Sequence, residues 1–184
     1  YDGYELFLDA LIDQILEKSE KETGLVNILG IVPNQDIFWK GNLKELKRIF
    51  EKLGLKANVL FGDFSGIDSV KKLSSAELTV VLSSWAGINA AKKLEEKYDI
   101  PFLIYPGLPV GPRDTSEFLH QLGEKLSIQE KVEDVIKEEE KGIKEYEELL
   151  TGMEEDGDFT EDDMAAIEDI IEDESPQNRL FELS

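Results

Sequence analysis

The apolar positions along the chain change repeatedly between helical and strand-like spacing. From Tyr4 onward apolar residues recur every three or four positions, which predicts a helix over about residues 3–20. The following segment at 25–32, LVNILGIV, is almost continuously apolar, as expected of a strand covered on both faces. Helical spacing then returns at Leu43, Leu46, Ile49, Phe50 and Leu53. Asn42 is the expected N-cap of this helix, and Gly54 occupies its C′ position.

The same strand and helix unit recurs along the chain. Further strands are predicted at 57–62, 78–83 and 102–105, with a polar stretch through Ser65, Gly66 and Asp68 between the first two. Further helices are predicted over 86–98, from Asp114 to about Leu126, and from Ser127 to about Leu150. Alternating strands and helices indicate βαβ crossovers. We therefore expect an α/β fold, a small doubly wound, Rossmann-like four-stranded parallel sheet with flanking helices.

Charge divides the chain unevenly and adds a second region to this picture. Residues 1–128 carry 19 acidic and 15 basic side chains, a net charge of −4, whereas residues 129–184 carry 22 and 5, a net charge of −17. We predict an α/β domain at 1–150, including N-terminal and C-terminal connector helices, and an acidic tail at 151–184. The tail is either an amphipathic helix, with Met164, Ile167, Ile170 and Ile171 at helical spacing, or a disordered, solvating extension.

Composition excludes several classes of function. The chain has no cysteine, which excludes disulfides, thiolate zinc sites and thiolate-held iron–sulfur clusters within it. It has no cluster of Lys and Arg that would bind phosphates, so we expect no nucleic-acid or membrane partner. No apolar run approaches the length of a membrane span, and we expect a soluble, cytoplasmic protein. Because the chain begins at Tyr1, we expect a processed product or a piece of something longer.

Candidate binding residues follow the predicted strands, because ligands of open α/β sheets approach the carboxyl ends of the strands. These positions combine amides, carboxylates, hydroxyls and an indole that can position a ligand. The predicted binding residues are Asn34, Gln35, Asp36, Ser65, Ser83, Ser84, Trp85 and Pro106. The bland alternative for the first loop is a long connection whose aromatic residues pack on the sheet edge.

Motifs of known chemistry are absent from the sequence. A serine nucleophile at Ser83 or Ser84 lacks a base, because the single histidine, His120, lies within a different predicted helix. There is no dinucleotide fingerprint, Walker loop or zinc-protease motif. The prolines of the PGLPVGP segment make it a stiff turn rather than a phosphate cradle. An EF-hand that starts at Asp156 would need Gly and Glu where Glu161 and Ile167 stand.

Several stretches, in order, carry a resemblance to a known family. VNILGIVP, GNLKELKRIFEKLGL, AELTVVLSSW, KKLEEKYDIPFL and GLPVGPRDTSEFL resemble the middle domain of the nitrogenase component 1 family. That family comprises the α and β chains of the molybdenum–iron protein, scaffold proteins for its cofactor, and related reductases of tetrapyrrole synthesis. The likeness covers about residues 1–150 and is somewhat closer to β-type chains.

The resemblance implies part of an oxidoreductase with a cofactor or substrate cavity and subunit contacts. A full-length family member would carry an iron–sulfur or molybdenum–iron cluster and would work with other domains or subunits, as a homo- or hetero-oligomer. Ser83 stands where α-type chains have the cysteine that binds the iron–molybdenum cofactor, so this role is not carried over. We expect no redox cluster, catalytic residue or metal ligand in this chain, and the isolated chain to be inactive. The alternative is a non-catalytic interaction module that uses the sheet edge or the acidic tail.

Overall fold

The computed structural model describes residues 2–32, 38–60 and 66–156. The chain divides into two compact units, Tyr1–Val132 and Glu133–Ser184. The first unit contains a four-stranded sheet and helices, and α6 begins within it and continues into the second unit. The helices are α1 (Asp2–Gln14), α2 (Trp39–Lys52), α3 (Gly66–Lys71), α4 (Ile88–Tyr98), α5 (Gly111–Leu126) and α6 (Gln129–Asp156). A 3-10 helix, η1, spans Lys72–Ser75.

The sheet confirms the predicted architecture. Its strands are β1 (Leu25–Leu29), β2 (Lys56–Val59), β3 (Leu78–Leu82) and β4 (Phe102–Tyr105). All three pairings are parallel, and the order across the sheet is β2-β1-β3-β4. Every residue of the two central strands is buried, which explains why they read as continuous apolar runs. The expected boundary between a domain at 1–150 and a tail at 151–184 stays a prediction.

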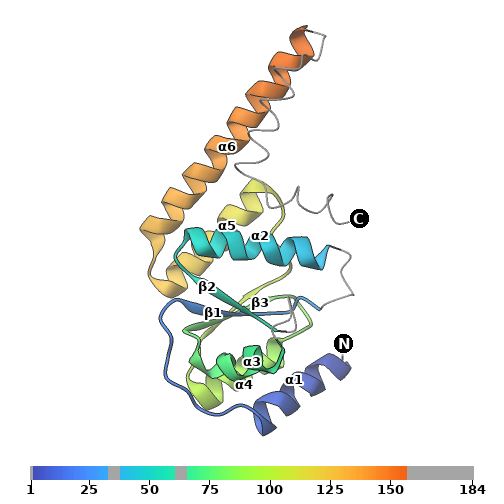
Figure 1. Cartoon of the computed structure of the whole chain (residues 1–184), viewed down its shortest axis with the longest axis vertical. Helices are drawn as coiled ribbons and strands as arrows, with labels where there is room; N and C mark the ends of the chain where they lie inside the picture. Colours follow the sequence, from blue (N-terminus) through green and yellow to red (C-terminus); the bar gives the residue numbers. More distant parts are fainter. Residues whose placement is uncertain (1, 33–37, 61–65, 157–184) are drawn as a thin grey trace. The chain divides into compact units, whose positions relative to one another are not determined.

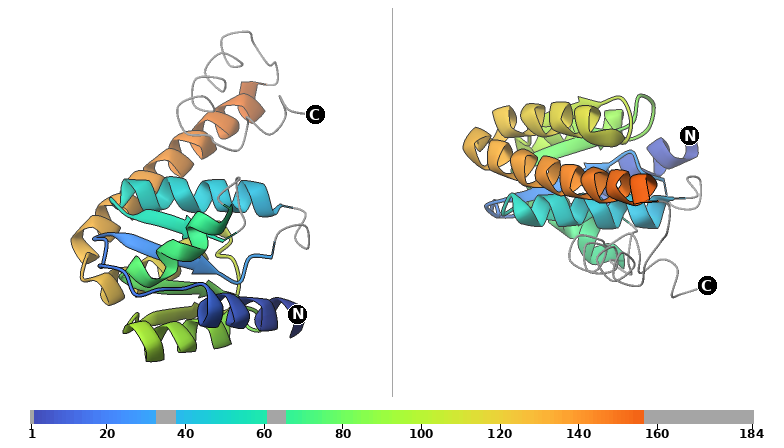
Figure 2. Two further views of the ribbon diagram at one scale, coloured as in Figure 1. Left: turned by 60° about the horizontal axis from the view of Figure 1, so that its bottom comes forward. Right: turned by 90° about the horizontal axis from the view of Figure 1, so that it is seen from above.

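Helices cover both faces of the sheet (Figure 1). On one face, α2 and α5 meet through the stacked rings of Phe50 and Phe118, whose centroids are 6.5 Å apart. On the other face, α1, α3 and α4 surround a core of apolar side chains, and α1 and α4 run side by side (Figure 2). The core residues on this second face include Leu8, Ile12, Leu29, Val70, Leu73, Val81 and Leu94.

Three helix boundaries differ from the sequence prediction. The first helix ends at Gln14 rather than near residue 20, because carbonyls beyond it bond to distant side chains. The Tyr98 hydroxyl donates to Leu16 O at 2.7 Å, and the Ser74 hydroxyl donates to Glu17 O at 2.6 Å. The second helix begins at Trp39, so Asn42 lies inside its first turn and the expected N-cap is wrong. The last described helix continues past Leu150 to Asp156.

The polar stretch between β2 and β3 contains a helix that sequence periodicity missed. Residues Gly66–Lys71 form α3 and the next four form η1, with Val70 and Leu73 fully buried. A polar row across the sheet anchors this crossover. Asn27 lies at 0 % exposure, and its Nδ2 donates to Leu73 O at 2.9 Å and to Thr79 Oγ1 at 3.3 Å. Asn58 Nδ2 donates to Asn27 Oδ1 at 2.9 Å and to Ser69 O at 3.0 Å.

Candidate functional site at the carboxyl edge of the sheet

The strand order places a topological switch point between β1 and β3. From β1 the chain passes to β2 on one side, and it then crosses to β3 on the other side of β1. Helices and loops diverge at such a point, and open α/β sheets bind ligands just outside it, at the carboxyl ends of the strands. Here these ends are Leu29 and Leu82, followed by Gly30 and Ser83. We therefore take this edge as the candidate site.

Two glycines bring the backbones at the switch point into close contact. Gly30 has φ +93°, and a Cβ built on it would lie 2.8 Å from Ser83 Cβ. Gly87 has φ +87°, and its Cβ would lie 2.9 Å from Leu29 Cβ and 3.2 Å from Gly30 N. Both positions therefore need glycine for backbone conformation and for space. The floor of the switch point is packed backbone, without room for an added side chain.

Ser83 uses its hydroxyl oxygen to shape the turn after β3. Ser83 is 4 % exposed, and its Oγ accepts the N–H of Trp85 at 3.2 Å and of Ala86 at 3.0 Å. These amides belong to the turn that precedes α4, where N–H groups lack partners within the helix. The oxygen predicted to position a ligand is thus committed to the backbone. His120 lies on the exposed surface of α5, in keeping with the rejected catalytic triad.

Ser84 and Pro106 are brought together, as the ends of the neighbouring strands β3 and β4 require. The exposed Ser84 hydroxyl donates to Pro106 O at 2.9 Å. This bond ties the turn after β3 to the turn after β4. A binding role for Ser83, Ser84, Trp85 and Pro106 stays a prediction. Four other predicted residues, Asn34, Gln35, Asp36 and Ser65, lie outside the described residues.

Large apolar side chains stand exposed in the turns and helix starts of this edge. Trp85 after β3 is 62 % exposed, Phe38 before α2 is 72 % exposed, and Val110 before α5 is 78 % exposed. Ile67 in the first turn of α3 is exposed as well. Because α2, α3, α4 and α5 follow the carboxyl ends of the strands, these residues belong to the same side of the domain. We call Phe38, Ile67, Trp85 and Val110 the edge patch.

A hydrogen-bonded pair fixes the turn between β4 and α5. The Tyr105 hydroxyl donates to Asp114 Oδ1, and Val110 N–H donates to Asp114 Oδ2 at 2.9 Å. Burial, helped by the bond to Asp114, raises the pKa of Tyr105 to about 12. The Tyr105 hydroxyl and the Val110 amide lower the pKa of the Asp114 carboxyl. Asp114 therefore holds the turn as a carboxylate rather than opening the helix as its N-cap.

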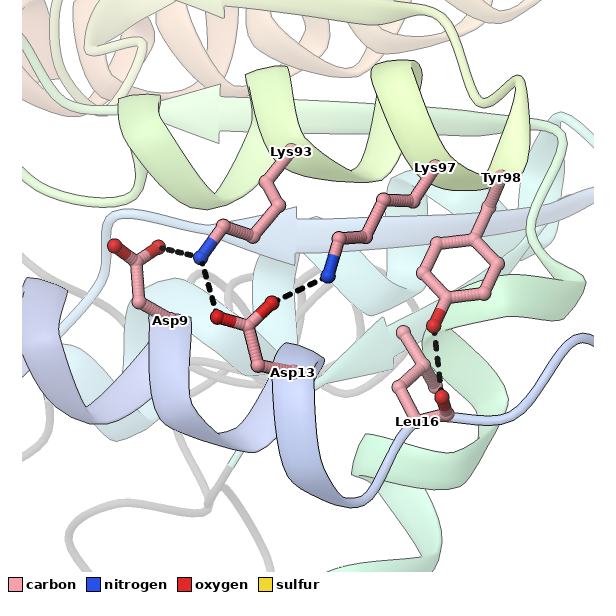
Figure 3. Close-up of polar contacts among 6 residues, drawn as sticks. All are labelled: Asp9, Asp13, Leu16, Lys93, Lys97 and Tyr98. Carbon is pink, nitrogen blue, oxygen red and sulfur yellow. Dashed lines mark hydrogen bonds and ion pairs between the residues drawn. The ribbon is translucent and has the colours of Figure 1, made fainter.

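The sequence analysis missed the contribution of α1. Three of its carboxylates face α4 at four-residue spacing, the helical repeat that could have revealed them. Glu5 accepts the N–H of Gly87, Asp9 lies 3.4 Å from Lys93 Nζ, and Asp13 binds Lys93 at 3.0 Å and also Lys97 (Figure 3). Hydrogen bonds from Lys97 and Lys93 lower the pKa of Asp13. This seam aligns the two helices in parallel, with their N-termini at the carboxyl edge.

The donors at this edge do not fit an iron–sulfur or molybdenum–iron cluster. Such clusters are held mainly by thiolates, and the chain contains no cysteine. Ser83, at the centre of the edge, already accepts two backbone amides. Among the residues that the structure describes, no three His, Cys, Asp or Glu side chains are grouped to hold a metal ion. None of the described helices is long and apolar enough to cross a membrane.

Comparisons with known proteins agree with this fold. The chain is 31% identical over 140 residues to the nitrogenase iron-molybdenum cofactor biosynthesis protein NifE of Rhodobacter capsulatus, covering 73% of this chain and 27% of that protein. It is 30% identical over 108 residues to a light-independent protochlorophyllide reductase subunit of Angiopteris evecta, covering 59% and 21%. The nitrogenase iron-iron protein beta chain of Rhodobacter capsulatus is 29% identical over 139 residues, covering 66% and 29%. The chain thus spans less than a third of the length of these relatives.

A solved structure shows the same fold. Nitrogenase Cp1 at pH 6.5 superposes with a TM-score of 0.64 at 23% identity, over 83% of this chain and 29% of that one. The family described as Nitrogenase component 1 type Oxidoreductase matches residues 1–154. This match covers the whole α/β domain, including the turn at Ser83 and the edge patch. The chain belongs to the nitrogenase component 1 type oxidoreductase family.

Proposed function

We propose that this chain supplies one α/β domain of a nitrogenase component 1 type oxidoreductase assembly. In this role the domain borders a cofactor or substrate cavity and contacts other domains or subunits, and it holds no redox cluster of its own. The observation that carries the proposal is the edge patch, in which Phe38, Trp85 and Val110 are each more than 60 % exposed. Exposed groups of large apolar residues mark contact surfaces in soluble proteins.

The chemistry of the edge supports a contact and positioning role. The hydroxyl of Ser83 and the carboxylate of Asp114 stabilise turns, and Ser84 links two turns. None of these bonds prepares a nucleophile or a proton donor for a reaction. The relatives, each over three times longer than the matched region, have ample additional chain for the chemistry. The domain therefore contributes shape and contacts, and the isolated chain is inactive as a reductase.

Footprinting of side chains tests the contact role. Hydroxyl-radical labelling of the purified chain should modify Trp85 and Phe38 readily because both are exposed. In the assembly isolated from cells, labelling of both should fall several-fold, whereas the exposed control His120 on α5 should react as before. Equal labelling of Trp85 in the chain and in the assembly would contradict the proposal.

Iron reconstitution tests the absence of a cluster. The chain should bind no stoichiometric iron after anaerobic treatment with ferrous iron and sulfide followed by chelation. Stoichiometric iron with a charge-transfer absorption band would overturn this part of the proposal. The assembly isolated from cells serves as the positive control for the reconstitution and chelation steps.

A second candidate function is a non-catalytic interaction module. The net charge of −17 over residues 129–184 favours it, because such a segment can attract a basic partner. This reading predicts that deletion of residues 151–184 leaves the α/β domain folded and abolishes association. Unchanged association after the deletion would count against the tail as the docking element.

A further inference from the structure

The turn that carries Ser84 and Trp85 is fixed through three successive amides. Ser83 Oγ accepts the first two, from Trp85 at 3.2 Å and Ala86 at 3.0 Å. The third, Gly87 N–H, donates to Glu5 Oε1. Gly87 is the N-cap of α4, and amides at a helix start have no partner inside the helix. One local hydroxyl and one distant carboxylate therefore complete the hydrogen bonding of the turn.

Glu5 reaches this amide from α1, 82 residues away in the sequence. Its second oxygen, Oε2, is buried and has no hydrogen-bond partner among the described residues. A buried carboxylate oxygen without a partner lowers stability, so the placement of Glu5 is not explained by stability alone. A residue retained at such a cost is a candidate for a functional role.

The turn cannot move inward from its position. A Cβ on Gly87 would already lie 2.9 Å from Leu29 Cβ, so the backbone of the turn rests directly on the end of β1. On the outer side the described contact to Gly87 N–H is the Glu5 carboxylate. The position of the turn is thus set by β1 from inside and by α1 from outside.

We infer that Glu5 is a positioning residue, which couples α1 to the edge turn formed by residues 83–87. A displacement of α1 releases Gly87 N–H and shifts Ser84 and Trp85, whereas α1 in place holds them at the edge. Leu6, the next residue on α1, is 69 % exposed, so a partner that contacts α1 lies beside this connection. The inference gives the proposed contact surface a means of regulation, and it rests on that proposed function.

Matched truncations in the full 184-residue chain separate positioning from stability. The test variant is E5A, and the control is D13A, which removes a carboxylate from the same helix and the same seam with α4. Both lose one α1–α4 contact, but only Glu5 touches the turn. The readouts are amide hydrogen exchange at Gly87 and the indole N–H signal of Trp85 in NMR spectra, assigned with W39F.

E5A should accelerate exchange at Gly87 about tenfold or more and should shift the Trp85 indole signal, since a charge-assisted bond is lost. D13A should leave both readouts at the wild-type values. E5Q keeps an acceptor of the same shape, so it should change exchange less than E5A and serve as the test if E5A unfolds. Wild-type readouts in both Glu5 variants, or the same changes in D13A, would overturn the inference.

These readouts do not depend on any partner. Loss of coupling in the chain refutes the role of Glu5 while the footprint of the assembly still reports on the contact surface. An unprotected Trp85 in the assembly refutes the contact surface, whatever the result for E5A.

Discussion

Replacement of Asn27 by leucine should destabilise the domain more than any surface change. Asn27 lies at 0 % exposure in the middle of β1, level with Asn58 on β2 and Thr79 on β3. Its side chain takes part in three hydrogen bonds, at 2.9, 3.3 and 2.9 Å. Leucine has a similar volume and removes all three bonds, leaving the carbonyl of Leu73 buried without this donor.

The expected loss follows from these bonds. At about 1 kcal/mol for each, N27L should lower the free energy of unfolding by about 3 kcal/mol. At roughly 2–4 °C per kcal/mol, the midpoint of thermal unfolding should fall by roughly 6–12 °C. Urea titration followed by circular dichroism measures the change, and an unaltered slope would show that the compactness of the two states is unchanged.

Thr79 supplies the matched control. T79V removes only the 3.3 Å bond, and Asn27 keeps its bond to Leu73 O, so the loss should be about 1 kcal/mol or less. The double variant N27L/T79V should lose less than the sum of the two, because both changes remove the same bond. A stability of N27L within about 0.5 kcal/mol of wild type would refute the view that this polar row anchors the α3 crossover.

Two further predictions concern the candidate site. G30A should lower the free energy of unfolding by about 2–4 kcal/mol, because φ is +93° and the new Cβ would meet Ser83 Cβ; urea titration measures the loss. The control G107A, with no atom within 4 Å of its Cβ, should stay within about 0.5 kcal/mol, and a loss equal to that of G30A would contradict the packing argument. The pKa of Asp114 is lowered from 3.8, so its contribution to stability is complete above that value and is lost as pH falls through the folded-state pKa. Unfolding of wild type and D114N should therefore converge in acid, and a constant difference between them at every pH would exclude this linkage.

The sequence predicted the sheet well because burial on both faces leaves a clear pattern. Leu25–Leu29 and Leu78–Leu82 are buried at every position, so their apolar runs identify them without knowledge of the fold. The helix Gly66–Lys71 escaped notice because six residues are too few to show a helical repeat. The end of α1 was misplaced because Ile15 and Leu16 continue its apolar spacing, while contacts from Tyr98 and Ser74 lead the chain away.

The candidate site was predicted only where it follows from strand order. Ser83, Ser84 and Pro106 adjoin strand ends, and the Ser84 bond to Pro106 O follows from the pairing of β3 with β4. The roles of Glu5 and Asn27 depend on partners far away in the chain, at separations of 82 and 46 residues. Such contacts leave no local pattern, so the single sequence could not reveal them.

The parallel alignment of α1 with α4 decides where the chain enters and leaves the domain. Asp2 begins α1 on the side of the edge patch, whereas α5 ends on the opposite side, where Lys131 Nζ lies 3.5 Å from a Cβ built on Gly54, just before β2. A protein tag fused ahead of α1 would therefore sit beside Trp85 and mask the edge patch. Labels for binding experiments belong after the C-terminus, and an N-terminal fusion becomes a deliberate means of blocking the edge.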